Sequence, residues 1–533
     1  MAGLKVAMVG HSLPDPVEID LPKNPDQAKA LLSLHNYTRV VTEDDTLIDH
    51  IAYLKKKKQV SHQDMFSVWE MNLCAGLLLT SMIRRNGIDC KSFNHLSQEN
   101  EDQVFQEIES YQPDIIAFTT TFVLTPKHFI GVANNLKNRF PTSFLVCGGH
   151  HVFTTLLPMT NTEKKNYMIQ SKVDCFVNDT QGEGAFLELV KKFKKDIFQV
   201  PNLIWRNDEG EVIFNRVAAE NNDINSTIID FDYLNDPLIA HIRTARSCAF
   251  KCAFCSYPSI AGPLVTMELE NIFDTMLKAK KAGLKALFFT DDTFNVPKDR
   301  FTKIIDGILE RDLQIPWYSF ARCQYLDENL IHKMKATGCR GVFLGVESGS
   351  DKILKKMKKG SISSFYKNGV RWMKEAGIIT VGSFIMGYPG ETFETVEVTR
   401  EFIENSGLDY YFIQPFYYLH HTPVHKRAKE FNLSGKGLFW SHSTMDWQEA
   451  SEHVNRLFLE IKNSTFVNPD YTLWEIAYLR AKEMTLDEIK EYREEINQMT
   501  RNQMFRFGLT SKNSTRSIHG GFENEQRSLK ENF

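Results

Sequence analysis

The sequence predicts a mixed α/β protein built from two consecutive series of alternating strands and helices. Short apolar runs alternate with longer amphipathic stretches over most of the chain, and this alternation is typical of parallel sheets with helical crossovers. A length of 533 residues is enough for about three or four domains. With 42% hydrophobic and 24% charged residues, the composition is that of a folded globular protein.

Residues 1–200 are expected to form a doubly wound, Rossmann-like domain. Its expected strands are 4–9, 88–93, 114–118, 144–147 and 174–177, and its expected helices are 73–85, 99–111, 127–140 and 184–193. About 60 residues separate the first strand from the first helix, and a stretch of that length is more often functional or partly helical than empty. It includes the run 55–58 of four lysines, which we expect to be a solvated face.

Residues 201–238 are expected to be a linker with a small hairpin, because residues 207–210 (Asn, Asp, Glu and Gly) are typical of a turn and lie between apolar runs. Residues 239–425 then carry six β/α repeats, which suit a partial (β/α)6 barrel of the TIM type. The expected strands are 239–244, 286–290, 317–321, 341–346, 380–387 and 410–415. Barrels of this type place their chemistry at the carboxyl ends of the strands.

Residues 426–508 are expected to form a helical C-terminal domain, in which Thr485 and Glu488 make a capping box. The tail 509–533, rich in Ser, Asn, Lys and Glu, is expected to be disordered.

The charge and hydropathy argue against nucleic-acid and membrane partners. The formal net charge is -4, without a basic stripe for nucleic acid. The mean hydropathy is -0.32, and no apolar run approaches the roughly 20 residues that a membrane helix needs. The first residues also lack the layout of a secretory signal. We therefore expect a cytoplasmic protein.

Three of the nine cysteines crowd into one short segment directly after the first barrel strand. Cys248, Cys252 and Cys255 are separated by three and by two residues. A zinc site usually has four ligands, often in two separated pairs, and no second pair follows here. Three thiolates on one loop can instead hold three irons of a [4Fe–4S] cluster and leave the fourth iron open. Packed or zinc-bound thiols are the alternative interpretation.

This cysteine spacing, with Phe254 before the last cysteine, is similar to the signature of the radical S-adenosylmethionine (SAM) superfamily. Further motifs that resemble the family's SAM-binding elements follow the next strands in order. Gln324 departs from the family pattern, because many relatives have an acid at this position. The resemblance assigns to SAM the residues Phe254, Asp291, Asp292, Arg322, Glu347, Ser348, Gly387, Pro389 and Glu391.

The first domain lacks the Gly-x-Gly-x-x-Gly sequence of a dinucleotide site, but glycines and hydroxyls follow three of its strands. Such residues at the carboxyl ends of parallel strands suit a flat ligand at the sheet edge. They resemble elements of the cobalamin-binding domains that are fused to radical SAM barrels. The residues concerned are Thr119, Thr120, Thr121, Gly148, Gly149, His150, Gly182 and Glu183. Because an Asp-x-His-x-x-Gly sequence is absent, we expect cobalamin to bind without a lower histidine ligand.

The resemblance implies a cobalamin-dependent radical SAM methyltransferase. SAM would be cleaved reductively at the cluster, with an electron from a donor such as flavodoxin or ferredoxin. The implied substrate is an unactivated carbon or a phosphinate phosphorus of a small metabolite or peptide. The nearest branch resembles the P-methyltransferase of phosphinothricin tripeptide biosynthesis.

An aromatic and histidine-rich stretch ends the sixth barrel strand. It is placed either to line a substrate pocket or to form an aromatic core strand. The substrate-pocket interpretation gives Gln414, Tyr417, Tyr418 and His420 as lining residues.

Two alternatives to methylation stay open. One is another radical SAM reaction on the same scaffold, such as cyclisation or rearrangement. The other is a non-catalytic sensor that uses cobalamin or the iron–sulfur cluster as its signal. The motifs assigned to SAM argue against the sensor, because a sensor does not need a SAM site.

Overall fold

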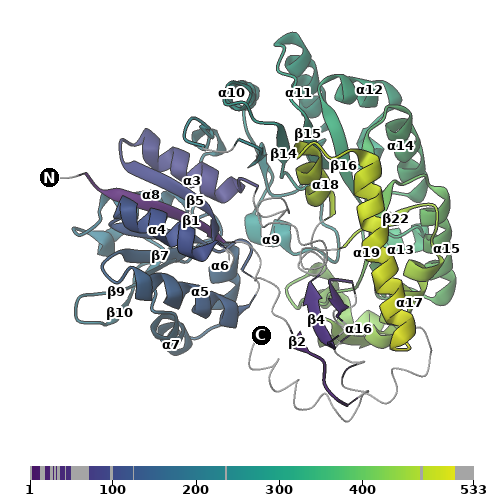
Figure 1. The fold of residues 1–533 in the computed structure, drawn as a ribbon, viewed down its shortest axis with the longest axis horizontal. Coiled ribbons are helices and arrows are strands. Elements are labelled where there is room, and N and C mark those ends of the chain that lie inside the picture. Colours follow the sequence, from purple (N-terminus) through teal and green to yellow (C-terminus); the bar gives the residue numbers. More distant parts are fainter. Residues whose placement is uncertain are drawn as a thin grey trace.

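The computed structural model of the chain describes residues 3–11, 19–24, 28, 32, 37–42, 44–49, 71–96, 100–123, 125–234, 237–468 and 472–509. These residues form two α/β bodies. In Figure 1 the first is mostly blue and the second is teal to yellow, and the purple residues 39–42 and 44–49 lie beside the second body. Each is built around a seven-stranded sheet, so the predicted α/β class is confirmed. Residues 55–58 and 510–533 lie outside the described residues.

The first sheet has a doubly wound strand order. Across the sheet the strands are β10 (Val212–Phe214), β9 (Leu203–Arg206), β8 (Cys175–Val177), β7 (Phe144–Gly148), β6 (Ile115–Thr119), β1 (Lys5–His11) and β5 (Asp89–Leu96). All pairs from β8 to β5 are parallel, whereas the expected hairpin β9–β10 is antiparallel and extends this sheet. The order of the parallel strands is 2-1-3-4-5, and in such sheets ligands bind where the order reverses, here between β1 and β6.

Helices cover both faces of this sheet. One face packs against α3 (Cys74–Arg85) and α8 (Glu183–Lys191), and the other against α4 (Glu101–Tyr111), α5 (Pro126–Arg139), α6 (His150–Leu156) and α7 (Asn161–Ser171). The four predicted helices are present. The sequence analysis missed α6 and α7, although Thr160 and Glu163 form a capping box at the start of α7 that marks a helix.

The second sheet is an open barrel of parallel strands. Its strands are β11 (Ile239–Ile242), β14 (Ala286–Phe289), β15 (Trp317–Ala321), β16 (Cys339–Glu347), β17 (Ile379–Met386), β18 (Tyr410–Pro415) and β22 (Thr465–Phe466). The outer helices are α10 (Leu269–Lys281), α11 (Lys298–Glu310), α12 (Glu328–Ala336), α13 (Asp351–Lys356), α14 (Ser363–Glu375), α15 (Phe393–Asn405) and α17 (Trp447–Glu460). All six predicted strands are present, and β22 was too short for its pattern to be recognised.

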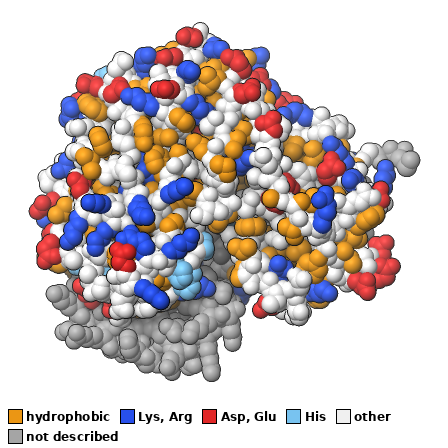
Figure 2. Space-filling view, turned by 180° about the vertical axis from the view of Figure 1, so that it is seen from behind, with side chains coloured by type: hydrophobic (Ala, Val, Ile, Leu, Met, Phe, Trp, Pro, Cys, Tyr) orange, Lys and Arg blue, Asp and Glu red, His pale blue; other side chains and the backbone are white. Residues whose placement is uncertain are grey.

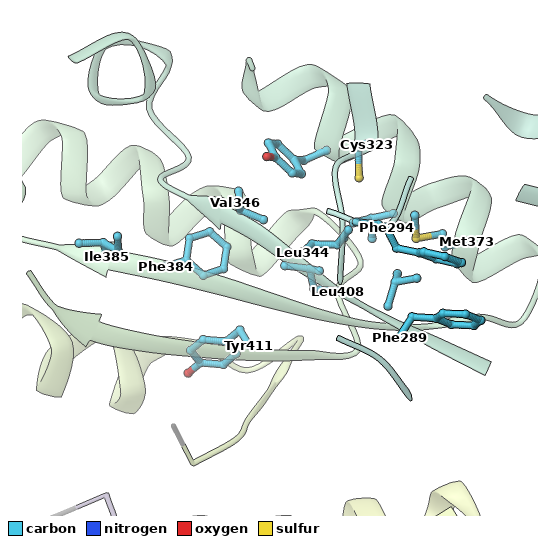
Figure 3. Packing of buried hydrophobic residues seen from close by; sticks show 14 of the residues in the cluster. Phe289, Phe294, Cys323, Leu344, Val346, Met373, Phe384, Ile385, Leu408 and Tyr411 are labelled. Atoms are coloured by element: carbon cyan, nitrogen blue, oxygen red, sulfur yellow. The ribbon is translucent and has the colours of Figure 1, made fainter. Parts of the chain in front are cut away.

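The barrel sheet is buried on both faces. On the outer face, Leu344 and Val346 of β16 lie with Phe384 and Met373 in one apolar cluster (Figure 3). On the inner face, α18 (Thr472–Ala481) packs within the barrel, and its Leu473 lies so close to β16 that a Cβ on Gly341 would meet it at 2.9 Å. The lower part of the barrel is therefore a packed core, and the open end is at the carboxyl ends of the strands.

Smaller elements complete the fold. Between β11 and α10 lie β12 (Ala245–Arg246), α9 (Tyr257–Ala261) and β13 (Val265–Thr266). The region expected to be helical contains α16 (Ala428–Phe431), α17, α18 and α19 (Leu486–Arg506), but also an antiparallel sheet of β19 (Ser434–Lys436), β20 (Phe439–His442) and β21 (Met445–Asp446). A third small sheet has β2 (Ile19–Asp20), β3 (Arg39–Val41) and β4 (Thr46–Asp49). The 3₁₀ turns are η2 (Ile197–Gln199), η3 (Ile224–Ser226), η4 (Cys323–Tyr325) and η5 (Pro423–Arg427).

No helix among the described residues is both long enough and apolar enough to cross a lipid bilayer.

The two bodies meet at the carboxyl ends of their parallel strands. Glu183, at the start of α8, forms an ion pair with Arg243, directly after β11, at 2.7 Å. Phe122, after β6, makes an edge-to-face contact with Trp474 of α18, with ring centroids 5.9 Å apart. The ion pair is mostly buried, with 9% of the Glu183 side chain exposed. It therefore holds the first body against the strand that leads into the cysteine segment.

We expect Glu183→Ala to destabilise the folded chain by about 2–3 kcal/mol, because the largely buried Arg243 guanidinium would lose its charged partner. The measurement is the urea midpoint of unfolding. The matched control is Glu188→Ala on the same helix, where the carboxylate is about half exposed and pairs only with surface lysines, and here the change should stay within about 0.5 kcal/mol. Equal effects of the two substitutions would contradict the role of the ion pair.

Candidate functional site

The three clustered cysteines lie on the loop between β12 and α9, at the open end of the barrel. Cys252 is 5% exposed, whereas Cys248 and Cys255 are partly exposed. Burial raises the pKa of the Cys255 thiol, and the nearby Cys252 and Cys248 raise it further, so the three sulfurs are close enough to repel one another as thiolates. Two backbone hydrogen bonds hold the loop at Ala253, whose N–H donates to the Met357 carbonyl and whose carbonyl accepts from the Val424 N–H.

The donor set fits an iron–sulfur cluster better than a single metal ion. In the part of the chain that the structure describes, no three His, Cys, Asp or Glu side chains converge closely enough to hold one ion. In a [4Fe–4S] cluster each thiolate binds a different iron, so the sulfurs need to surround a cluster and not to converge on a point. Cys248, Cys252 and Cys255 are the residues that would hold it.

Two adjacent aspartates after β14 have different surroundings. The buried Asp291 carboxylate accepts hydrogen bonds from the backbone N–H groups of Thr244 at 2.6 Å and Ala245 at 2.9 Å, and from the Thr244 hydroxyl. Asp292 is exposed at the rim. Desolvation by the surrounding protein and the negative charge of Asp291 together raise its pKa to about 7. Asp291 thus holds the start of the cysteine segment, and Asp292 is the carboxylate that faces the open site.

Arg322, after β15, contacts the cysteine loop directly. Its Nη2 donates to Cys252 Sγ at 3.0 Å and its Nη1 to the Lys359 carbonyl at 2.6 Å. The guanidinium lies over the Phe250 ring, 3.5 Å from the centroid. Of the nine residues assigned to SAM, Arg322 is therefore the one that donates a hydrogen bond to a clustered cysteine.

Glu347 ends β16 in a buried ion pair. Its Oε1 lies 2.8 Å from Lys359 Nζ, and Ser383 donates to Oε2 at 3.3 Å. The backbone of Glu347 has φ +69° beside a break in strand register, which turns the side chain into the barrel mouth. A Cβ on Gly345 would meet Glu347 Oε1 at 2.6 Å, so this glycine makes room for the ion pair.

The remaining residues assigned to SAM shape the loops around the site. Ser348 is fully buried and its hydroxyl lies 3.2 Å from that of Thr399 on α15. Gly387 donates its N–H to Glu391 Oε2 at 2.5 Å, and Pro389 is buried between them. Burial raises the pKa of Glu391 to about 8.

Phe254, also assigned to SAM, is partly exposed, and Lys359 Nζ lies 5.8 Å from its ring centroid. It thus lies beside the Glu347–Lys359 ion pair at the barrel mouth.

The carboxyl edge of the first sheet offers an open surface between β6 and β7. Thr121, Gly149 and His150 are exposed there. The buried Thr120 donates its N–H and its hydroxyl to the Gly148 carbonyl at 3.0 and 2.9 Å, which fixes the two strand ends side by side. Thr119 is partly exposed at the end of β6. Small side chains and exposed backbone at this point suit a broad, flat cofactor.

Gly182 and Glu183 follow the next strand, β8. Gly182 and Gly148 both lie against Val177 of β8, which a Cβ on either glycine would meet at 3.0 and 3.3 Å. Glu183 pairs with Arg243 and accepts from Asn222 Nδ2 at 3.0 Å. Asn222 in turn accepts on its carbonyl from Arg246 Nη1 at 3.0 Å. The Gly182–Glu183 turn therefore joins the first body to the entry of the cysteine segment.

The four expected substrate-pocket residues fall into two groups, according to whether their side chains are hydrogen-bonded within the chain. Gln414 near the end of β18 and Tyr417 after that strand are exposed, with 44% of Tyr417 accessible. Tyr418 is buried, with its hydroxyl 2.6 Å from His425 Nδ1. His420 is exposed, and its Nε2 lies 2.9 Å from the Gly435 carbonyl. The structure thus leaves Gln414 and Tyr417 as the open side chains.

Lys359, Arg243 and His421 are not among the predicted site residues. Lys359 belongs to the sequence 357–360 that continues the motif of Glu347, but only the fold shows it buried beside that residue. Arg243 ends the first barrel strand without a motif. Burial lowers the pKa of His150, and the nearby His421 lowers it further.

Comparison with known proteins identifies the barrel. The family model described as the radical SAM superfamily matches residues 242–403. An uncharacterized methyltransferase of Pyrococcus horikoshii is 30% identical over 352 residues, which are 62% of this chain and 73% of that protein. Other curated relatives match over 40–56% of their own length.

Two solved structures share the fold over most of the chain. The radical SAM methyltransferase TsrM of Kitasatospora setae, solved with cobalamin and a [4Fe–4S] cluster, has a TM-score of 0.58 at 16% identity and covers 80% of this chain and 96% of its own. The cobalamin-dependent SAM radical enzyme OxsB, solved with aqua-cobalamin and SAM, has a TM-score of 0.58 at 15% identity, with 99% and 76% covered. The arrangement of the two bodies is therefore a known one.

We expect the stability of the chain to fall as pH rises from about 4.5 to 8, because the buried Glu391 holds its proton in the folded state up to about pH 8. The folded state then binds more protons than the unfolded one across this window, and stability decreases with pH at up to about 1.4 kcal/mol per pH unit. Urea unfolding of wild type and Glu391→Gln at pH 5.5, 7 and 8.5 measures this. Parallel pH profiles of the two proteins would contradict it.

We expect Arg322→Gln to lower the reduction potential of a cluster bound by the three cysteines. The Arg322 guanidinium donates to Cys252 Sγ, and a positive donor at a cluster sulfur stabilises the reduced, more negative state. The measurement is a potentiometric titration of the reconstituted protein, with Arg340→Gln on the exposed part of β16 as control. An unchanged potential in Arg322→Gln, with the cluster fully loaded, would show that the hydrogen bond does not tune the cluster.

Proposed function

The chain belongs to the radical SAM superfamily, and we propose that it is a cobalamin-dependent methyltransferase of that family. Its substrate would be a small metabolite or peptide, methylated at an unactivated carbon or a phosphinate phosphorus. The observation that supports this most directly is the meeting of the two strand edges. The edge of the first sheet lies against the barrel, because Phe122 after β6 contacts Trp474 of α18 and Glu183 pairs with Arg243 after β11. A cofactor on that edge would adjoin a substrate in the mouth.

The chain's own residues would bind and orient the reactants. Cys248, Cys252 and Cys255 would hold the cluster, with Arg322 donating to Cys252. The Glu347–Lys359 pair presents a carboxylate and an ammonium at the barrel mouth, which suits the amino and carboxylate groups of SAM. The exposed Asp292 adds a second acceptor. When bound, the cluster and SAM supply the radical that removes a hydrogen atom, and cobalamin supplies methyl transfer.

The first body would contribute the cobalamin surface. Thr119 at the end of β6, with Thr120 and Thr121 after it, lies beside the reversal point between β1 and β6, where a doubly wound sheet with this strand order binds its ligand. Gly148 and Gly149 at the end of β7 extend that edge. Glu183 and Gly182, which hold the interface, would act on cobalamin only by positioning the first body.

The carboxyl end of β18 would contribute to the substrate site. Gln414 and Tyr417 are exposed at the end of this strand, on the same side of the barrel as Glu347. An amide and a phenol can hydrogen-bond a polar metabolite or a peptide backbone. The buried Tyr418 and the neighbouring His420 would support this wall.

The test is anaerobic reconstitution with iron, sulfide, cobalamin, SAM and a reductant. We expect 5′-deoxyadenosine formation that is lost in Cys252→Ala, and a corrin spectrum that survives gel filtration. Thr121→Trp should abolish corrin retention and leave deoxyadenosine formation intact, because it fills the exposed edge of the first sheet. The matched control is Thr142→Trp, an exposed threonine before β7 at the opposite end of that strand, which should retain corrin.

Two outcomes would contradict the proposal. Deoxyadenosine formation without retained corrin in the wild type would favour another radical SAM reaction, such as cyclisation. Retained corrin without deoxyadenosine, in a protein with a loaded cluster and added substrate candidates, would favour a sensor.

A further inference from the structure

A basic surface lies beside the cysteine loop. It is made by α13 with the turn that follows it and by η5 with α16. Its cationic residues are Lys352, Lys355, Lys356, Lys358, Lys426, Arg427 and Lys429. All of these are exposed except Lys356 and Arg427, which are partly exposed. The same segments contribute only two carboxylates, Asp351 and Glu430.

The two segments form one continuous surface. Arg427 Nη1 donates to the Lys356 carbonyl at 3.4 Å, which joins η5 to α13. The pKa of Glu430 is lowered chiefly by its hydrogen bond to Arg427, and Lys356 and Lys358 of the other segment lower it further. Figure 2 shows Lys and Arg side chains crowded on one part of the face seen from behind, next to a group of histidines.

This basic surface is attached directly to the loop that carries the cysteines. The Ala253 N–H donates to the Met357 carbonyl at 2.7 Å, and the Val424 N–H donates to the Ala253 carbonyl at 2.8 Å. Ala253 is the neighbour of Cys252. One backbone hydrogen bond therefore separates each half of the surface from the residue next to a cluster ligand, which is a short path for an electron.

The lysines of this surface are available to a partner. Within the described part of the chain, Lys355, Lys358 and Lys429 have no carboxylate within ion-pair distance. The chain as a whole has a net charge of -4, so this local excess of positive charge is not a general property of its surface. A compact positive patch steers and orients a negatively charged protein.

We infer that the basic surface is the docking site for an acidic one-electron donor protein. This inference rests on the radical SAM chemistry proposed above, which needs one electron at the cluster for each SAM cleaved. The donor is oxidised by one electron, and the cluster accepts that electron and passes from the 2+ to the 1+ state. No atom or proton needs to cross the interface.

The test measures the rate of cluster reduction in the full chain with a reconstituted cluster. The probe is reduced flavodoxin, an acidic protein donor, and the small reductant for comparison is photoreduced deazaflavin. The test variant is Lys355→Glu with Lys429→Glu, one residue from each half of the surface. The control variant is Lys281→Glu with Lys303→Glu on α10 and α11, which makes the same change in net charge at exposed positions elsewhere.

At low ionic strength we expect the test variant to be reduced by flavodoxin on the order of tenfold more slowly than wild type. The control variant should keep most of the wild-type rate, and deazaflavin should reduce all three proteins equally. The difference in flavodoxin rate between wild type and the test variant should shrink at about 0.5 M salt, because exposed charges are then screened within a few ångströms.

Two results would overturn the inference. One is an unchanged flavodoxin rate in the test variant, or a rate that falls equally in the control. The other is an equal loss with deazaflavin, which would mean that the substitutions disturb the cluster and not the docking. Because the readout is the cluster spectrum, a failure of methyl transfer or of corrin binding would leave this rate measurable and would be recognised separately.

Discussion

The buried Asp291 carboxylate is the interaction on which the site depends, because it fixes where the cysteine segment begins. It satisfies two backbone N–H groups and one hydroxyl at the point where β11 ends and the chain turns toward Cys248. Burial alone would favour the neutral acid and raise its pKa. Hydrogen bonds from Thr244 lower this pKa in part, and the nearby Arg300, which donates to the Thr244 carbonyl at 2.8 Å, lowers it further. Without this carboxylate, buried N–H groups would be left unpaired.

A second constraint is that two parallel sheets present their carboxyl edges to each other. Each edge is the place where its own fold type binds ligands, so bringing them together creates one shared region with two cofactor surfaces. The Glu183–Arg243 ion pair and the Phe122–Trp474 contact hold this arrangement. Arg243 is five residues before Cys248 in the chain, so the same pair that joins the bodies also anchors the cysteine segment.

Local patterns were sufficient to predict the strands and the cysteines, but not the long-range partners. The six barrel strands follow from short apolar runs, and the cysteine loop from spacing, because both are properties of neighbouring residues. The burial of Lys359 is different. It depends on a break in the register of β16 that turns Glu347 inward and on Gly345, which leaves space for the pair. The local sequence places Lys359 in the stretch that continues the Glu347 motif, but it does not show that this lysine is buried.

The same limit explains why motif residues of one type take different roles. Asp291 and Asp292 are neighbours in the sequence. The Asp291 carboxylate accepts hydrogen bonds from the backbone, whereas the Asp292 carboxylate faces the open site. Glu391 is buried against the backbone of its own turn, whereas Glu347 meets an ammonium at the barrel mouth. In each pair the surrounding donors decide whether the carboxylate shapes a loop or meets a ligand. The motifs therefore encode the shape of the loops as much as the groups that touch SAM. Gln414 and Tyr417, which we propose as substrate-facing residues, lie outside these motifs, and the fold leaves both side chains exposed.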